Sequence, residues 1–496
     1  MGSYITFPEL LIWLPLLAGI LCFFTKREQS ARSLALLFSL IILGISAASL
    51  FYTGTKYATW NAVIYFYPNN IGNTFFVGLD GTGRLLSFLT ALAFPIIFIA
   101  TYKNNYKNAA SFYGLMLLTQ SGLMGVFCSM DALLFYFFWE LALIPVYFLC
   151  SKWGGEKRIQ ATFKFFVYTF TGSLLMLTGI IYVYLHTSGK VFEDGTQVAH
   201  SFALSSFYNA TLSGQEQNWL FWLFFIAFAV KMPVFPFHTW QPDTYDQSPT
   251  SVTMVLSGIM VKMGLFGVVR WLIPLFPLAT VKFSHIVMVL SIIGIIYASC
   301  IAIVQDNLKK LVAYSSIAHI GLMCAALFAM NQVSVQGVML QMFNHGINII
   351  GLWIVVDLLE KQTGVKQISK LAGVANKAPV LTILLVIIAL ANIALPLTNA
   401  FTGEFLMFSG LYKFNPWYAA VAGIGIILSA VYTLNMIQKV FYGNTVSTTE
   451  AIKDISWNEK FILGFIVCLI FIIGIYPQPV IDLTREAVTA LVSKIK

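Results

Sequence analysis

Charge is scarce in this sequence. Only 10% of its 496 residues are Asp, Glu, Lys or Arg, whereas a soluble domain carries roughly 25%. Hydrophobic residues account for 58% of the chain. This balance excludes an ordinary water-soluble globular protein, and it indicates a polytopic membrane protein.

Cysteine and nucleotide-binding motifs are also sparse. The six cysteines lie far apart without a CxxC spacing, so the sequence indicates neither a metal site nor a disulfide framework. We find neither a GxGxxG motif after a strand nor a Walker-type loop. We therefore expect no cofactor in this chain.

Long polar stretches that could form a soluble domain are missing as well. Fourteen hydrophobic runs of about 20 residues use most of the chain, and they predict an all-α membrane protein with about fourteen transmembrane helices. The first run, ITFPELLIWLPLLAGILCFF, is too long for a signal-peptide core and has no basic flank before it. We expect it to be a retained helix.

The net charge of +9 is distributed as expected for membrane topology rather than for nucleic-acid binding. Lys and Arg gather in the loops after the first, third, fifth and eleventh runs, which the positive-inside rule places in the cytoplasm. An even number of spans then puts both termini on the outer face. These loops carry Lys26, Arg27, Arg32, Lys103, Lys107, Lys152, Lys157, Arg158, Lys361, Lys366, Lys370 and Lys377.

Four ionisable residues lie too deep in their runs to reach the membrane surface: Glu140, Lys231, Lys262 and Glu404. Each costs about 2.5–3.5 kcal/mol at mid-helix, so each is a candidate functional residue. Glu140 has eight apolar residues directly before it and ten after. Lys231 lies roughly 18 Å along its helix, too deep to snorkel. The structural alternative is a fixed buried ion pair.

Other polar residues leave both interpretations open. His319 and His345 lie inside helices, where they could relay protons or simply pack with a hydrogen bond. Lys164, one turn from a helix start, could snorkel or act in the function. Arg270, at the end of a run, is expected to be an interfacial anchor.

For a buried carboxylate and a buried ammonium, the energetics favour a pair that can separate over a fixed ion pair. At 4 Å and an effective dielectric of 20 they attract by about 4 kcal/mol, which changes proton affinity roughly a thousandfold. Moving one partner away would therefore make the other release or take up a proton. We predict such a switch between Glu140 and Lys231, at the start of a proton relay.

Prolines interrupt two of the runs. Pro233 and Pro236 break the seventh run (218–240), and Pro396 breaks the twelfth (379–412). Broken helices at membrane depth require protein or water to satisfy the backbone, so Lys231 should face a hydrated interior.

The spacing of these features predicts an internal repeat, because 91 residues separate Glu140 from Lys231 and 85 separate His319 from Glu404. We predict two inverted five-helix repeats, 110–271 and 284–441, between an N-terminal unit (1–109) and a C-terminal helix (459–496).

Five motifs in the same order resemble the antiporter-like subunits of respiratory complex I, the proton-pumping NADH–quinone oxidoreductase, a family shared with the Mrp antiporters. They are FWELALIPVYFL, KMPVFPFHTWQPD, SPTSVTMVLSGIMVKMGLFGVVR, DNLKKLVAYSSIAHIG and FTGEF. Glu404 makes the chain similar to the M-type subunits, equivalent to mitochondrial subunit 4, because the L- and N-type and Mrp relatives usually carry lysine there. The chain also ends soon after its fourteenth run, without the extension of the L type.

The resemblance implies a role for each matched position. Glu140 and Lys231 would form the labile pair, and Lys262 would be the central carrier. His319 and His345 would connect it to Glu404 at the outer half-channel. His238 also matches the family, although so near a helix end it could serve only hydration or packing. Tyr245, in QPDTYDQSPT, stands where the family commonly has a histidine.

The resemblance also implies the surroundings of the chain. Partner subunits, including the L and N types, would bind NADH, FMN, iron–sulfur clusters and quinone, in a bacterial inner membrane. Two alternatives stay open: an Mrp-type sodium/proton antiporter subunit, and a structural membrane scaffold with static buried ion pairs.

Overall fold

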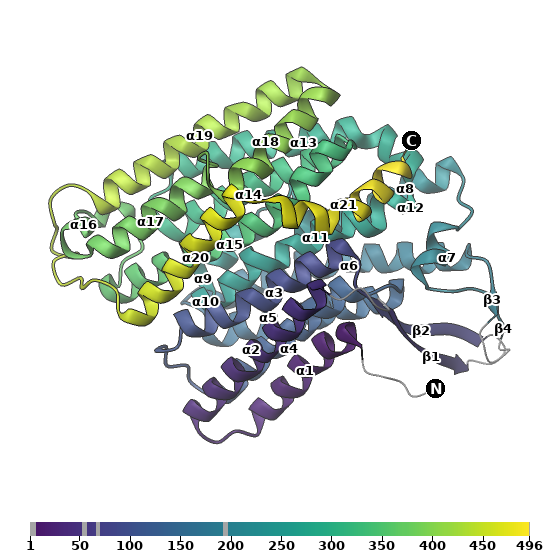
Figure 1. Ribbon diagram of the computed structural model, residues 1–496, viewed down its shortest axis with the longest axis horizontal. Helices are drawn as coiled ribbons and strands as arrows, with labels where there is room; N and C mark the ends of the chain where they lie inside the picture. The colour runs from purple at the N-terminus through teal and green to yellow at the C-terminus, as the bar shows by residue number, and fades with distance from the viewer. Residues whose placement is uncertain (1–5, 52–56, 66–69, 192–196, 496) are drawn as a thin grey trace.

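The chain forms an elongated bundle of helices that run roughly parallel to one another (Figure 1). This computed structural model describes residues 6–51, 57–65, 70–191 and 197–495. Eleven helical segments in this part of the chain are long and apolar enough to cross a membrane. The predicted all-α polytopic architecture is confirmed; the total of fourteen spans, the unit boundaries and the inverted repeats stay predictions.

The first half of the bundle is built mainly from long helices. They are α1 (Phe7–Phe23), α2 (Glu28–Phe51), α3 (Gly81–Ala100), α4 (Ala109–Cys128), α5 (Ala132–Trp153), α6 (Arg158–Leu185), α7 (Leu204–Tyr208), α8 (Gly214–Lys231) and α9 (Trp240–Gln247). Side chains at several helix starts cap the free backbone N–H groups: Asp80 accepts from Gly83 and Asp131 from Leu134.

The second half begins with one continuous helical segment, 250–275, that contains two π-helical turns. It comprises α10 (Thr250–Val255), a π turn (Leu256–Met260), α11 (Val261–Gly267), a second π turn (Val268–Leu272) and α12 (Ile273–Leu275). The remaining helices are α13 (Pro277–Val304), α14 (Leu308–Phe328), α15 (Gln332–Thr363), α16 (Val374–Lys377), α17 (Pro379–Asn392), α18 (Asn399–Phe414), α19 (Pro416–Phe441), α20 (Trp457–Ile475) and α21 (Gln478–Ser493), with a 3₁₀ turn at Ile368–Lys370.

Two helical segments form the centre of the bundle. Segment 250–275 and helix α15 are buried along their apolar length, whereas α2 and α20 expose most of theirs. Helix α15 packs against α14, α17, α18, α20, α21 and α3. Polar side chains on α15 and in segment 250–275 are therefore shielded from lipid by a shell of other helices.

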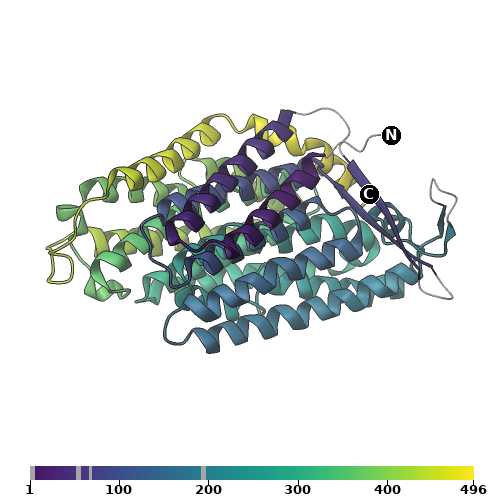
Figure 2. The same ribbon diagram turned by 90° about the horizontal axis from the view of Figure 1, so that it is seen from below.

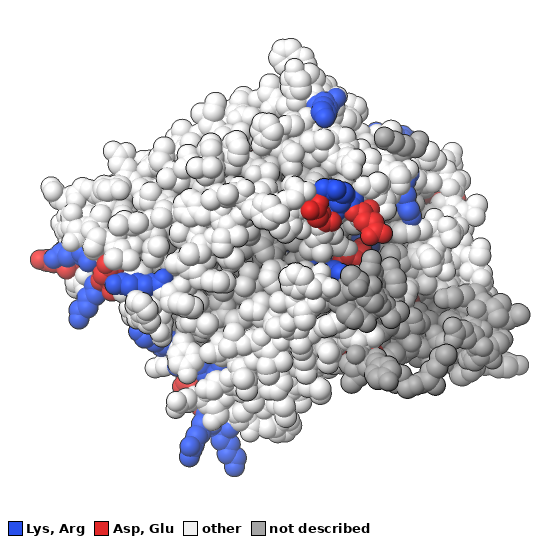
Figure 3. Space-filling model, viewed as in Figure 1, with Lys and Arg blue, Asp and Glu red and all other residues white. Residues whose placement is uncertain are grey.

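The two ends of the described chain lie at the same end of the bundle, and both views agree on this (Figures 1 and 2). The turn between α1 and α2 and the segment around α16 lie at the opposite end. In Figure 3, charged side chains gather toward that opposite end and over α21, while the broad face between them is almost free of charge. This distribution suits a belt in contact with lipid.

Three elements were not expected from the sequence. Two short antiparallel hairpins lie at the end that holds the termini: β1 (Tyr57–Tyr65) with β2 (Asn70–Gly78), and β3 (Lys190–Val191) with β4 (Gln197–Val198). The predicted C-terminal helix divides at Pro477, and α21 turns across the bundle. Its Thr484 hydroxyl accepts a 2.7 Å hydrogen bond from the Gln336 amide of α15.

Candidate functional site

The first helix interruption places Lys231 at the end of α8. The helix stops there because Pro233 has no N–H to continue it. The carbonyl of Val230, released at the break, accepts a 2.9 Å hydrogen bond from the indole N–H of Trp240. The protein thus satisfies backbone groups at the break, and the Lys231 side chain is turned inward, with 1% of its surface exposed.

The ammonium of Lys231 lies among aromatic rings. Its Nζ atom is 5.5 Å from the centre of the Trp139 ring and 5.9 Å from that of Phe165, distances typical of cation–π contacts. Within the described residues it has no hydrogen-bond partner, and neither does the buried Oε1 atom of Glu140, the neighbour of Trp139. The structure therefore shows no hydrogen bond between Glu140 and Lys231.

Lys262 has two partners at the centre of the bundle. Its Nζ atom donates to the carbonyl of Ser257 at 2.8 Å and lies 2.8 Å from Nδ1 of His345. Ser257 belongs to the π turn just before Lys262, and such turns often occur at functional sites. A protonated lysine can only donate, so Nδ1 of His345 is then the acceptor and its ring proton sits on Nε2.

His345 continues the contacts toward the second interruption. Its ring centre is 5.7 Å from that of His319, whose Nδ1 atom is 3.2 Å from Oε1 of Glu404. Both His319 and Glu404 are more than nine-tenths buried. Lys262, His345, His319 and Glu404 therefore follow one another in space, although they come from four different helices.

Neutral polar side chains support this row. The Gln341 amide donates to Oε1 of Glu404 at 3.3 Å, and the Asn392 amide lies 3.3 Å from Nε2 of His319. These residues were not predicted from the sequence, because only ionisable side chains were considered as candidates within the hydrophobic runs. A signal was present, since Gln341, Asn344, His345 and Asn348 recur at helical spacing within one otherwise apolar run.

The second interruption is held by a pair of asparagines. Helix α17 ends at Asn392 and α18 begins at Asn399, as predicted from Pro396. Asn399 and Asn348 exchange two hydrogen bonds of 3.0 Å. Leu397 has a left-handed backbone (φ 72°), which is strained for a side chain of this size and is maintained by the surrounding structure.

Three other candidates lie outside the row. His238 is buried beside the ring of Tyr297, with ring centres 5.2 Å apart. Tyr245 is buried against Trp353, at 5.9 Å. Arg270 is 4% exposed and pairs with Asp80, and its expected place as an interfacial anchor stays a prediction. The acidic N-cap of α3 lies close enough in space to bind it, which the sequence does not reveal.

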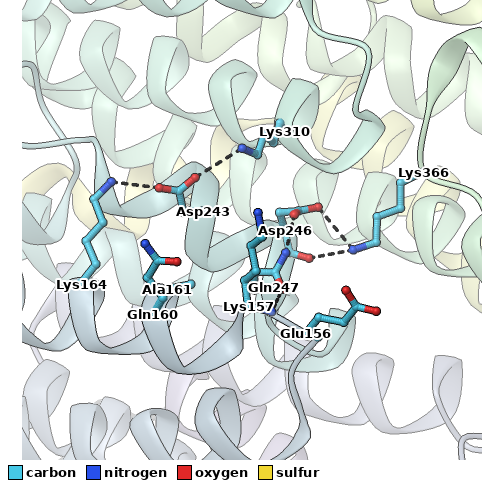
Figure 4. A pocket seen from close by; sticks show the side chains of 11 residues that line it. Glu156, Lys157, Gln160, Ala161, Lys164, Asp243, Asp246, Gln247, Lys310 and Lys366 are labelled. Carbon is cyan, nitrogen blue, oxygen red and sulfur yellow. Dashed lines mark hydrogen bonds and ion pairs between the residues drawn. The ribbon is translucent and has the colours of Figure 1, made fainter.

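Lys164 lines a pocket of about 650 Å³ on the side of the positively charged loops (Figure 4). Asp243 bridges two lysines there, with Lys164 at 2.9 Å and Lys310 at 3.3 Å. Figure 4 shows the two ammonium groups pointing at this carboxylate from opposite sides.

Asp246 is another carboxylate of this pocket. Burial alone would raise the pKa of the Asp246 carboxyl. A hydrogen bond from Asn307, the nearby Lys366 ammonium and a hydrogen bond from Gln247 outweigh burial and hold its pKa below the usual value. The partners of the Asp246 carboxylate therefore favour its charged form.

Comparison with known proteins gives a consistent result. Residues 129–429 match the family model described as NADH:quinone oxidoreductase/Mrp antiporter, transmembrane. The chain is 36% identical to NADH-quinone oxidoreductase subunit M of Rickettsia prowazekii (strain Madrid E) over 97% of this chain and 98% of that protein.

Solved structures share the fold. A chain of respiratory complex I from Thermus thermophilus with bound NADH is 28% identical, with a TM-score of 0.88 over 99% of this chain and 100% of that one. A chain of the Mrp complex from Dietzia sp. DQ12-45-1b has a TM-score of 0.83 over 99% of both chains. At 16% identity, the second likeness concerns the fold alone.

Proposed function

The chain belongs to the NADH:quinone oxidoreductase/Mrp antiporter transmembrane family, and we propose that it is the M-type, proton-translocating membrane subunit of an NADH–quinone oxidoreductase. The observation that carries this proposal is the buried row of Lys262, His345, His319 and Glu404. Each member can hold a proton and lies beside the next, in the part of the bundle that helices shield from lipid.

In this function the row moves protons while electrons flow elsewhere. A change in the distance between Glu140 and Lys231 would change the proton affinity of both groups. The proton released by Lys231 passes to Lys262, then through His345 and His319 to Glu404. NADH, FMN, iron–sulfur clusters and quinone belong to partner subunits in this proposal. Among the described residues, no group of three or more His, Cys, Asp or Glu side chains could hold a metal ion.

The two alternatives are less well supported. A static scaffold would hold its buried charges in hydrogen-bonded ion pairs, whereas the Lys231 ammonium has no hydrogen-bond partner among the described residues. An Mrp-type antiporter shares the fold, but the resemblance in sequence is to the M-type subunits, and Glu404 stands where Mrp relatives usually carry lysine.

We infer the setting from the same resemblance and from charge. L- and N-type subunits are the expected neighbours, in a bacterial inner membrane. The lysine-rich loops face the cytoplasm and both termini face the outside, in keeping with the shared end of the bundle in Figure 1. Fusing a phosphatase that is active only outside the cytoplasm to the C-terminus tests this orientation: an inactive fusion would contradict it.

The decisive test of function uses the purified complex in proteoliposomes. Lys262→Ala should assemble and yet lose most NADH-driven proton uptake, while Lys282→Ala, at an exposed position of α13, should pump normally. Normal pumping by an assembled Lys262→Ala complex would contradict the relay. Copurification of the chain without flavin and iron–sulfur subunits would favour the Mrp-type alternative.

A further inference from the structure

The buried ring of His319 has a partner at each of its two nitrogens. Its Nδ1 atom lies 3.2 Å from Oε1 of Glu404, and its Nε2 atom lies 3.3 Å from the side-chain nitrogen of Asn392. All three residues are more than nine-tenths buried, and Asn392 is the last residue of α17, at the second helix break. The route of a proton through His319 therefore depends on these two contacts.

The contact with Asn392 decides which ring nitrogen carries the proton. The side-chain nitrogen of an asparagine only donates, so Nε2 of a neutral His319 accepts, and the ring proton lies on Nδ1. Nδ1 then donates to the carboxylate of Glu404. In this arrangement His319 is ready to give a proton to Glu404, whereas the lone pair of its Nε2 atom is already engaged.

The passage of a proton reverses this arrangement. Because Nδ1 faces Glu404, a proton from His345 enters the His319 ring at Nε2 as another leaves from Nδ1. The ring then carries its proton on Nε2, which has to donate. The nitrogen of the Asn392 amide cannot accept this hydrogen bond, but its oxygen can. A rotation of the amide by half a turn exchanges the two atoms.

Hydroxyl groups beside Asn392 suit both orientations of its amide. The amide nitrogen donates to Oγ of Ser315 at 3.2 Å, and the hydroxyl of Tyr432 donates to the same oxygen at 3.0 Å. A serine hydroxyl has one hydrogen and two lone pairs. It therefore accepts from the amide nitrogen in one orientation and donates to the amide oxygen in the other. The amide keeps this hydrogen bond either way, so no buried polar group is left unpaired after the rotation.

We propose that Asn392 is a positioning residue of the relay, and that its amide rotates with each proton that His319 passes on. In the first orientation the amide nitrogen keeps the ring proton on Nδ1. In the transfer the Nδ1–H bond breaks and an O–H bond forms on Glu404, while an N–H bond of His345 breaks and a new one forms at Nε2 of His319. The amide oxygen then accepts from Nε2–H.

The return of the His319 ring proton to Nδ1 is an isomerisation without net gain or loss of protons, and the amide rotates back with it. The orientation of one neutral side chain thus follows the state of the relay. This inference rests on the proposed function of the chain.

Removing both hydrogen-bonding functions of Asn392 tests the contact directly. Leucine has nearly the shape of asparagine but neither donates nor accepts. In the purified complex in proteoliposomes, we expect Asn392→Leu to oxidise NADH and to move at least twofold fewer protons per NADH. The matched control is Thr382→Val, a buried polar position of the same helix, which should pump normally. An unchanged proton ratio in Asn392→Leu would overturn the inference.

The Ser315 hydroxyl gives a second test, in which a conservative variant should rescue the function. Ser315→Ala removes the group that serves both amide orientations, and Ser315→Thr keeps it. We expect protons per NADH to fall at least twofold in Ser315→Ala and to return most of the way in Ser315→Thr. Equal ratios in these two variants would overturn the inference, because a role in packing alone does not depend on the hydroxyl. If Asn392→Leu does not assemble, the two Ser315 variants decide the matter.

Infrared difference spectra test the rotation itself. Between the resting and the NADH-oxidising complex, we expect a band of the side-chain amide that is present in the unsubstituted protein and in Thr382→Val but absent from Asn392→Leu. Identical difference spectra in the three proteins would show an amide that stays fixed, and they would overturn the proposed rotation.

The outcome is distinguishable from a failure of the proposed function. If Lys262→Ala stops pumping while Asn392→Leu keeps its full proton ratio, the role of Asn392 is wrong and the relay stands. If Lys262→Ala pumps normally, the relay itself is wrong, and the inference falls with it.

Discussion

Replacing Lys231 by methionine is expected to leave the complex at least as stable while stopping proton pumping. Methionine has nearly the length of lysine but carries no charge. In the structure Lys231 is 1% exposed, and its ammonium lies 5.5 and 5.9 Å from the centres of two aromatic rings. Each such contact contributes about 0.5–2 kcal/mol.

These contacts do not offset the cost of the buried charge. Removing an ammonium from water costs several kcal/mol even after relaxation, and within the described residues no carboxylate accepts a hydrogen bond from Lys231. Lys231→Met should therefore stabilise the folded subunit by about 1–4 kcal/mol.

The assay compares two properties of one preparation. Thermal dissociation of the solubilised complex should occur at the same or a higher temperature in Lys231→Met, while proton uptake by proteoliposomes falls severalfold or more. Lys231→Arg should lose part of the pumping, because a guanidinium does not release its proton at neutral pH. The exposed Lys282→Met should change neither property.

A destabilised Lys231→Met complex would refute this reasoning. It would mean that the ammonium anchors the helix break through its contacts, as in the scaffold alternative. Full pumping in Lys231→Met or Lys231→Arg would contradict the role of Lys231 in the relay, because the proton on this side chain would then play no part in transport.

Three further predictions concern other positions. Glu140→Gln should assemble and lose most NADH-driven pumping, because the amide cannot carry the charge that alters the proton affinity of Lys231; proteoliposome assays with unchanged proton uptake would count against the switch. His345→Ala should remove a contact of Lys262 that contributes about 1.5–3 kcal/mol, so we expect lower thermal stability of the complex together with lost pumping. A variant with unchanged stability and pumping would show that the contact is unimportant. Gly337→Ala should destabilise the subunit by about 1–3 kcal/mol, measured by thermal dissociation, because the new Cβ would lie 2.7 Å from a backbone nitrogen of α18. The matched control is Gly423→Ala, whose Cβ would have nothing within 4 Å. Equal stability of the two variants would contradict the close packing of α15 on α18.

The depth of the charges along their hydrophobic runs and the places where helices break could be predicted from the amino-acid sequence. Both properties are local. Glu140 and Lys262 lie in the middle of apolar runs whatever surrounds them, and Pro233 and Pro396 lack the N–H that a continuous helix needs. The membrane class and the candidate residues could therefore be predicted before any tertiary contact was known.

Which of these residues contact one another depends on how the helices pack. Lys262 bonds to His345 across 83 positions of sequence, and the neutral Gln341 reaches Glu404 across 63. Arg270 pairs with Asp80, and Nζ of Lys231 lies among the rings of Trp139 and Phe165 without a hydrogen-bond partner in the described residues. Proton transfer and ion pairing depend on separations of a few ångströms, and those separations are set by the packing of helices that are distant in the chain.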